Sequence, residues 1–186
     1  TIYLLMRLSW VSSLKNIPGT KVKKVIKLEK TNIGGVAKMD NFARFSLVGL
    51  EDCPGVAFKV FSLLSRHNVN VDIILQSVGR SGSKDISFTC PLSSLDDARW
   101  GLEENKDVLE YDSIEVDDNV AKISLVGAGM MTHVGVASDM FEALYDAGIN
   151  IQMIATSEIR ISVLVNKDDA NRAIKVVHDK FFGNED

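Results

Sequence analysis

Hydrophobic residues recur along this chain with two spacings, that of a strand and that of a helix. Segments of the two kinds alternate, and they predict the elements of the fold. Phe45 to Val48 is typical of a strand, and from Val56 to Leu64 apolar residues recur at helical spacing. A tight polar turn, Gly49 to Gly55, joins the two, and Val71 to Val78 is rich in the β-branched residues of strands. The pattern predicts a strand–turn–helix–strand unit.

The unit continues with three more predicted elements. A hairpin-type loop, Gly79 to Ser83, leads to a strand, Asp85 to Cys90, and a helix begins at Ser94. Ser113 to Val116 is a closing strand, and the acidic pair Asp117-Asp118 after it is predicted to form a solvated turn between units. The whole unit is βαββα with a closing strand.

The chain then repeats this order. Ser46 to Gly49 matches Ser124 to Gly127, and after a turn two residues longer the matches resume. They are Gly55 with Gly135, Ala57 with Ala137, Phe61 with Phe141, Leu64 with Leu144, Asn70 with Asn150 and Ser77 with Ser157. Matches that persist through a whole unit indicate an internal duplication.

The second copy lacks a closing strand of its own. Its last predicted helix, Asp168 to Phe182, runs nearly to the C-terminus, so Val36 to Met39 is the strand candidate left to complete it. We therefore predict an α+β fold of two tandem ferredoxin-like βαββαβ units with antiparallel sheets, the second completed by this N-terminal strand.

The N-terminal residues fit neither copy. Ile2 to Val11 is predicted to be a strand that belongs to an upstream domain, and Lys21 to Leu28 a connecting segment. We expect residues 1–30 to be the tail of that domain with its linker, 31–118 the first unit and 119–186 the second.

Composition argues against several classes of function. The net charge is −4 with both signs mixed, which does not suit a nucleic acid partner. Two distant cysteines, Cys53 and Cys90, indicate reduced thiols in a cytoplasmic protein. The three histidines have no ligand-like spacing, so we expect no metal, and no apolar run reaches the roughly 18 residues that would suit a membrane.

The two helix-opening turns carry the most suggestive chemistry. A helix start offers free N–H groups and a positive dipole end to a small anion, while a carboxylate such as Asp52 suits an ammonium group. The first turn, with Asp52, Gly55, Val56 and Ala57, is thus complementary to both ends of a free amino acid. An ordinary strand-to-helix turn is the alternative, and the duplication favours a ligand site.

Further residues occupy matching positions in the second copy and after each helix. The second turn contributes Thr132, His133, Gly135 and Val136, although His133 also suits a helix cap. After the helices come Asn70-Val71-Asp72 with Gln76, and Asn150-Ile151-Gln152. Gln76, polar in an apolar strand, has the best individual claim to a ligand or interface role.

A different class of function remains as an alternative. Gly127-Ala128-Gly129 follows a strand and imitates a dinucleotide-binding turn, but Thr132 replaces the third glycine. A small nucleotide-dependent enzyme built on the Gly127 turn is this alternative. No catalytic motif is visible, so the sequence leaves enzymatic activity undecided.

Several segments together resemble the regulatory region of bacterial aspartokinase, which carries two ACT domains. These are D-x-P-G-V-A at Asp52 to Ala57, N-V-N-V-D at Asn68 to Asp72, D-I-S-F-T at Asp85 to Thr89, G-I-N-I-Q at Gly148 to Gln152 and T-S-E-I-R-I-S-V at Thr156 to Val163. Ser12-Ser13 to Pro18-Gly19-Thr20 also resembles the end of the family's kinase domain. The second turn departs from the family pattern, with Val134 where the family has Pro.

The resemblance implies feedback control of ATP-dependent aspartate phosphorylation by lysine, threonine or both, bound between paired ACT domains. It assigns effector contacts to Asp52, Gly55 to Ala57, Gln76, Asn150 and Ile151, with Thr132 to Val136 and Asp72 at a second site. It implies a homodimer through ACT sheet edges and a kinase domain partner, with no cofactor in this chain and ATP and Mg in the parent kinase. An ACT module of another amino-acid pathway protein is the alternative within this class.

Overall fold

The computed structural model describes residues 7–9, 21–23, 32–79, 82–128 and 134–183 of the chain. Two compact units are present, Thr1–Lys30 and Thr31–Asp186. In the first, β1 (Arg7–Ser9) pairs antiparallel with β2 (Lys21–Lys23). The prediction of a connecting segment from Lys21 is wrong for these three residues, because they alternate as a strand and pair as one.

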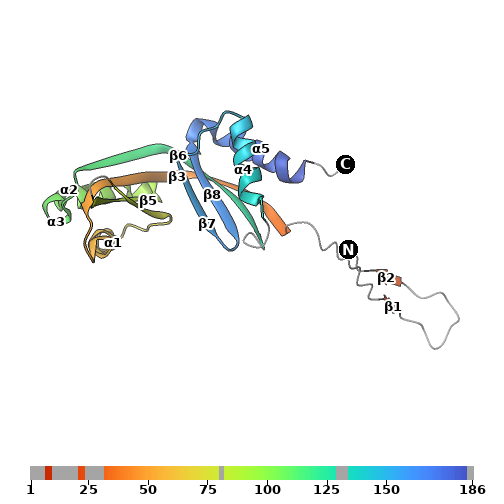
Figure 1. Cartoon of the computed structure of the whole chain (residues 1–186), viewed down its shortest axis with the longest axis horizontal. Helices are drawn as coiled ribbons and strands as arrows, with labels where there is room; N and C mark the ends of the chain where they lie inside the picture. The colour runs from red at the N-terminus through yellow and green to blue at the C-terminus, as the bar shows by residue number, and fades with distance from the viewer. Residues whose placement is uncertain (1–6, 10–20, 24–31, 80–81, 129–133, 184–186) are drawn as a thin grey trace. The chain divides into compact units, whose positions relative to one another are not determined.

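A six-stranded antiparallel sheet, in the order β4-β5-β3-β6-β8-β7, organises the second unit (Figure 1). Its strands are β3 (Asn32–Glu51), β4 (Ile74–Val78), β5 (Ser83–Pro91), β6 (Ser113–Ala128), β7 (Met153–Ser157) and β8 (Arg160–Asn166). The helices are α1 (Val56–Arg66), α2 (Leu95–Glu104), α3 (Lys106–Leu109), α4 (Val136–Asp146) and α5 (Ala170–Phe182), with 3-10 turns at Leu92–Ser94 and Lys167–Asp169.

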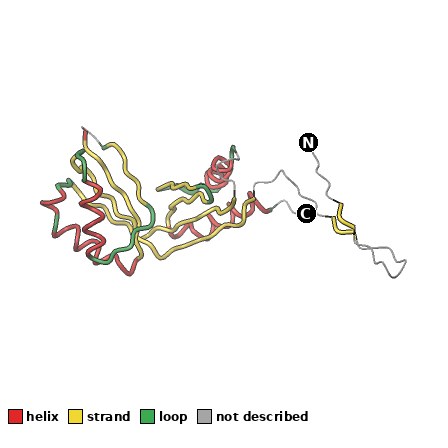
Figure 2. The backbone as a smooth tube through the Cα atoms, turned by 90° about the horizontal axis from the view of Figure 1, so that it is seen from below, coloured by secondary structure: helices red, strands yellow, loops and turns green. Residues whose placement is uncertain are grey.

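Two long strands, β3 and β6, run through both repeats (Figure 2). Phe45 lies opposite Val116 in the first repeat, and Val36 lies opposite Leu125 in the second. The N-terminal strand thus completes the second repeat, as predicted. The predicted turn at Asp117-Asp118 is wrong, because both residues lie inside β6 and register shifts near Phe42 accommodate the change of repeat.

Each repeat buries its own core against its part of the shared sheet. Ile114 and Val116 of β6 pack into the first core, whereas Ile123 and Leu125 of the same strand lie in the second. Register shifts lie between these two sets of residues, so the alternation of side chains along β6 does not continue unbroken from one core to the other. Helices α1 and α2 cover the first core, and α4 and α5 cover the second (Figure 1). The second repeat therefore has a sheet face that its own helices do not cover.

Several predicted element boundaries differ from the structure by a few residues, among them those of β4 and of the helix that follows β5. Strand β4 begins at Ile74 instead of Val71, although Asp72 N–H already donates to the Thr89 carbonyl of β5. The helix predicted from Ser94 begins at Leu95 and is interrupted, because the Asn105 side chain donates to the Gly101 carbonyl at 2.9 Å and ends α2.

Candidate functional site

The two helix-opening turns have the same backbone shape. Gly55 has φ of 97° and Gly135 has φ of 105°, values that glycine adopts readily and other residues avoid. Among the described residues, no side chain caps either helix, and no atom lies within 4 Å of a Cβ built on either glycine. Each turn therefore presents a helix start at which N–H groups of the first turn can meet an anion, although in α1 the Val56 N–H already donates to the Cys53 carbonyl at 3.4 Å.

Asp52 lies beside the first open helix start, and its carboxylate forms an ion pair with a lysine of the same repeat. Its carboxylate is 3.3 Å from Lys84 Nζ, and the side chain is 51% exposed. Lys84 belongs to β5 and lies opposite Val78 of β4, the strand that carries the exposed Gln76. Sequence reasoning missed Lys84, since a lysine within a strand gives no signal until the strand pairing is known.

The second turn is described in part. Thr132 and His133 lie outside the described residues, while Val136 is buried at the start of α4. Beyond that helix Asn150 is exposed and Ile151 packs against the second core. The Oε1 atom of Gln152 is buried with no hydrogen-bond partner among the described residues. An orphaned acceptor is costly, so a ligand N–H or ammonium group would suit it.

Asp72, which sequence reasoning grouped with a second site, has a partner inside the chain. Its carboxylate forms an ion pair with Lys122 Nζ from β6. It also lines a cleft of about 190 Å³ between the start of β4 and the β7–β8 hairpin. The other lining residues are Ile73, Ile74, Ala155, Thr156, Ser157, Arg160 and Ser162. Thr156 occupies the position in the second repeat that Gln76 occupies in the first. This correspondence could have marked Thr156 as a candidate site residue from the sequence.

The predicted site residues therefore form two half-sites. Asp52, the Gly55 turn and Gln76 belong to neighbouring parts of the first repeat, and Asn150 to Gln152 belong to the second. Within the described ranges, no hydrogen bond or ion pair joins the two groups. No three His, Cys, Asp or Glu side chains of the described chain gather as a possible metal site.

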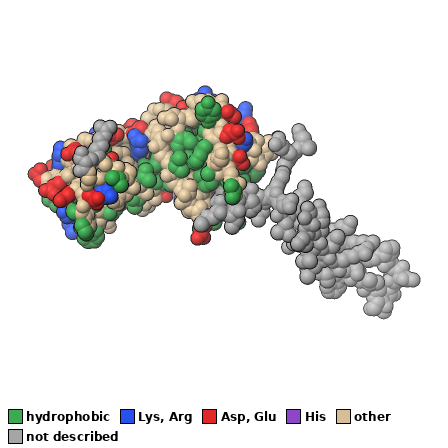
Figure 3. All heavy atoms as spheres, in the orientation of Figure 1, with side chains coloured by type: hydrophobic (Ala, Val, Ile, Leu, Met, Phe, Trp, Pro, Cys, Tyr) green, Lys and Arg blue, Asp and Glu red, His purple; other side chains and the backbone are tan. Residues whose placement is uncertain are grey.

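The strands at the two ends of the sheet expose apolar side chains. All five residues of β4 are exposed, with Ile74 at 54% and Val78 at 75%, and Ile154 of β7 is exposed too. Hydrophobic side chains also gather on the surface over the second repeat (Figure 3). An exposed apolar edge is a template for pairing with another strand.

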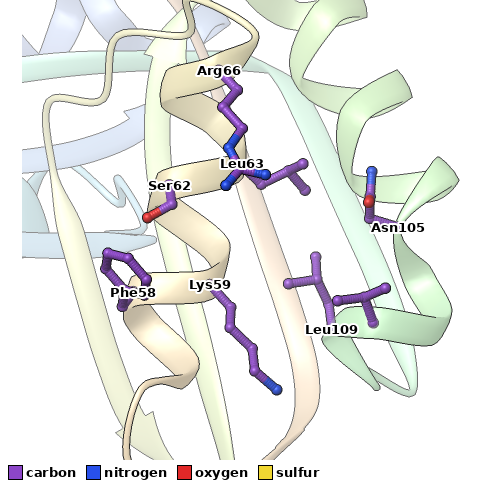
Figure 4. A pocket seen from close by; sticks show the side chains of 8 residues that line it. Phe58, Lys59, Ser62, Leu63, Arg66, Asn105 and Leu109 are labelled. Atoms are coloured by element: carbon purple, nitrogen blue, oxygen red, sulfur yellow. The ribbon is translucent and has the colours of Figure 1, made fainter.

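A separate groove of about 170 Å³ lies between α1 and α3 (Figure 4). Phe58, Lys59, Ser62, Leu63 and Arg66 line it from α1, facing Asn105, Val108 and Leu109. No predicted site residue lines this groove, so it is distinct from both half-sites.

Gly127, on which the alternative nucleotide-dependent enzyme would depend, is part of the sheet. Gly127 lies within β6, opposite Ile33, and its N–H donates to the Ile159 carbonyl at 2.9 Å. That N–H is not available to a phosphate. In the described part of the chain, no helix is long and apolar enough to cross a membrane.

Comparisons with known proteins agree with this architecture. A family model described as "ACT domain" matches residues 45–105 and 123–181, one match in each repeat. Aspartokinase from Corynebacterium efficiens is 41% identical over 175 residues, covering 91% of this chain and 42% of that protein. The ligand-free regulatory subunit of aspartate kinase from Thermus thermophilus is 35% identical with a TM-score of 0.76, covering 81% of this chain and 99% of the other. Aspartokinase III from E. coli, in complex with lysine and aspartate, is 25% identical with a TM-score of 0.66, covering 95% and 39%.

Two βαββαβ repeats that share one sheet, each with an open helix start, define a tandem ACT-domain regulatory protein. More specifically, the chain belongs to the aspartokinase family and corresponds to its regulatory ACT region. It spans 42% of the length of the curated Corynebacterium relative.

Proposed function

We propose that this chain is an allosteric sensor of free lysine, threonine or both, which gives feedback control of ATP-dependent aspartate phosphorylation. The observation that carries the proposal is the pairing of Asp52 with an uncapped helix start at Gly55. The carboxylate and the helix N–H groups are complementary to the ammonium and carboxylate groups of an amino acid. The E. coli relative that was crystallised with lysine supports this ligand class.

The Asp52–Lys84 ion pair is suited to exchange partners. Asp52 is half exposed, and exposed ion pairs contribute little net stability because water and salt screen them. A ligand ammonium group can therefore replace Lys84 Nζ at low cost, and the released Lys84 can meet the ligand carboxylate. The half-buried position of Lys84 keeps its ammonium group near the turn.

A second copy of the chain would complete the site. The two half-sites lie on different repeats, and the exposed apolar edges of β4 and β7 offer strands for pairing between copies. In a homodimer joined through these edges, the first turn of one copy would meet Asn150 to Gln152 of the other. The orphaned Gln152 Oε1 would then gain a donor from the effector.

The remaining parts of the proposal concern the whole enzyme. We place the aspartokinase catalytic domain upstream as the partner, with ATP and Mg bound there and none in this chain, in the cytoplasm. The effector acts by its differential affinity for two conformations of that assembly.

Thermal melts with single amino acids test the proposal. Lysine, threonine and methionine are added separately, and NAD(P) is added as the probe for the nucleotide-dependent alternative. A ligand at 100 times its Kd adds about 2.7 kcal/mol to stability. We expect lysine or threonine to raise Tm, and Asp52→Ala to abolish that rise. Asp118→Ala, which removes an exposed carboxylate of β6, is the matched control and should keep it.

Three other outcomes of these melts would contradict parts of the proposal. A rise with NAD(P) alone supports the nucleotide-dependent enzyme, and a rise with methionine alone supports the ACT module of another amino-acid pathway protein. If the lysine or threonine shift survives Asp52→Ala, the role of Asp52 is wrong.

A further inference from the structure

Lys122 is a lysine almost completely withdrawn from water. Its side chain is 3% exposed, and it lies on the face of the second repeat's sheet that α4 and α5 leave uncovered. A buried ammonium group must be paired to be tolerated. Its partners are the Asp72 carboxylate and the ring of Phe42, whose centroid lies 4.5 Å from Nζ in a cation–π contact.

The segment that Lys122 holds belongs to the other repeat. Asp72 and Ile73 connect α1 to β4, and both are fixed to Thr89 of β5: Asp72 N–H donates to its carbonyl at 3.0 Å and Ile73 N–H donates to its hydroxyl at 3.1 Å. The Ile73 side chain packs with Met153 and Leu164 of the second repeat. Residues 72 and 73 thus connect the first repeat to the sheet of the second, just before the strand that carries Gln76.

The internal duplication provides a comparison for this contact. In the repeat alignment, Lys122 corresponds to Arg44, and Asp72 corresponds to Gln152. Arg44 pairs with Asp117 of its neighbouring strand at 3.7 Å, and Gln152 Oε1 has no partner among the described residues. The buried link between repeats is therefore built at one of two equivalent places, so the fold alone does not require it.

We propose that Lys122 is a positioning residue for the effector half-site of the first repeat. It fixes the start of β4, and hence Gln76, relative to the second repeat, and Asp72 is its anchor and not a ligand contact. The inference rests on the proposed amino-acid function and adds a residue that touches no effector. Without the ion pair, the start of β4 is more mobile. An effector must then order this segment when it binds, and the free-energy cost of that ordering lowers the effector's affinity.

Calorimetric titration of the full chain with lysine and with threonine tests the inference. Lys122→Met keeps the length and apolar stem and removes the charge, so the fold should persist. We expect Lys122→Met to weaken binding about tenfold, which corresponds to about 1.4 kcal/mol. Lys122→Arg should restore most of the affinity. Arg44→Met is the matched control at the repeat-equivalent position and should bind like the unmodified chain.

Hydrogen exchange provides a readout that needs no ligand. Lys122→Met should lower amide protection at Ile73 to Gln76 more than at β8, whereas Arg44→Met should not. Unchanged protection and unchanged affinity in Lys122→Met would overturn the inference, as would equal effects of the two substitutions. Full loss of binding in Asp72→Asn with normal binding in Lys122→Met would assign Asp72 to the ligand instead. If the unmodified chain binds neither amino acid, the proposed function fails, and the exchange result still decides the positioning role.

Discussion

Replacing Gly55 by Ala would test the shape of the first turn directly. The substitution adds one methyl group at φ of 97°, and no atom lies within 4 Å of its position, so the cost is backbone strain and not a clash. A left-handed backbone costs a residue with a Cβ roughly 1–2 kcal/mol. For a chain of this size each kcal/mol lowers Tm by about 2–4 °C, so we expect a drop of about 2–8 °C.

Two other glycines serve as controls in the same denaturation assay. Gly135→Ala, at φ of 105° with equally open surroundings, should lose a similar amount of stability. Gly35→Ala also has open space around its Cβ but lies in β3 without a positive φ, so the stability of this variant should not fall and should rise slightly. A Gly55→Ala protein that melts with the unmodified chain would refute the strain argument.

The Gly55→Ala variant also tests whether the first turn takes part in effector binding. Strain at residue 55 is relieved by rotating the peptide groups that open α1, and these groups carry the N–H donors proposed to meet the effector carboxylate. Gly55→Ala should therefore weaken the lysine or threonine response in calorimetry. An unchanged affinity would mean that the ligand does not use this helix start.

Three further predictions concern folding, thiol reactivity and pH. Deleting residues 30–40 should lower hydrogen-exchange protection more in the second repeat than in the first; equal losses would contradict the shared-strand arrangement. The half-buried Cys53 should react with a thiol reagent in the native protein, and effector binding should slow it, whereas burial raises the pKa of the Cys90 thiol to about 11 and should delay its reaction until unfolding. The hydrogen bond and charge of Lys180 lower the pKa of Glu142, so this pair contributes stability above the ordinary Glu pKa and loses it as pH falls through the lowered value. Glu142→Gln should accordingly lower Tm slightly at pH 7 and leave it unchanged at pH 2; equal drops at both would show that the ion pair is not the cause.

The duplication made most of the fold predictable. Gly55 and Gly135 mark the same turn, and the missing closing strand led to residues 36–39 because every other segment was assigned. Polar residues such as Asp40 and Asp117 obscured the continuity of β3 and β6, since a polar pair indicates a turn unless a second strand pairs alongside it.

The candidate site was predictable where its residues are close in sequence. Asp52 and Gly55 lie in one turn, so local chemistry was enough to single them out. Lys84 and Lys122 could not be found in this way, because each meets its carboxylate across a strand pairing or a contact between repeats. A lysine in a strand looks solvated until the tertiary structure withdraws it from water.

The shared sheet also constrains how the chain can fold during synthesis. The strand segment that completes the second repeat, residues 32–39, leaves the ribosome before either repeat is made. It must wait, unpaired, until the distal half of β6 emerges, while the first repeat can already close around the proximal half of β6. The first repeat thus becomes the template on which the nascent second repeat assembles, and a ribosome that stalls before β6 would leave an apolar strand exposed to chaperones and to neighbouring nascent chains.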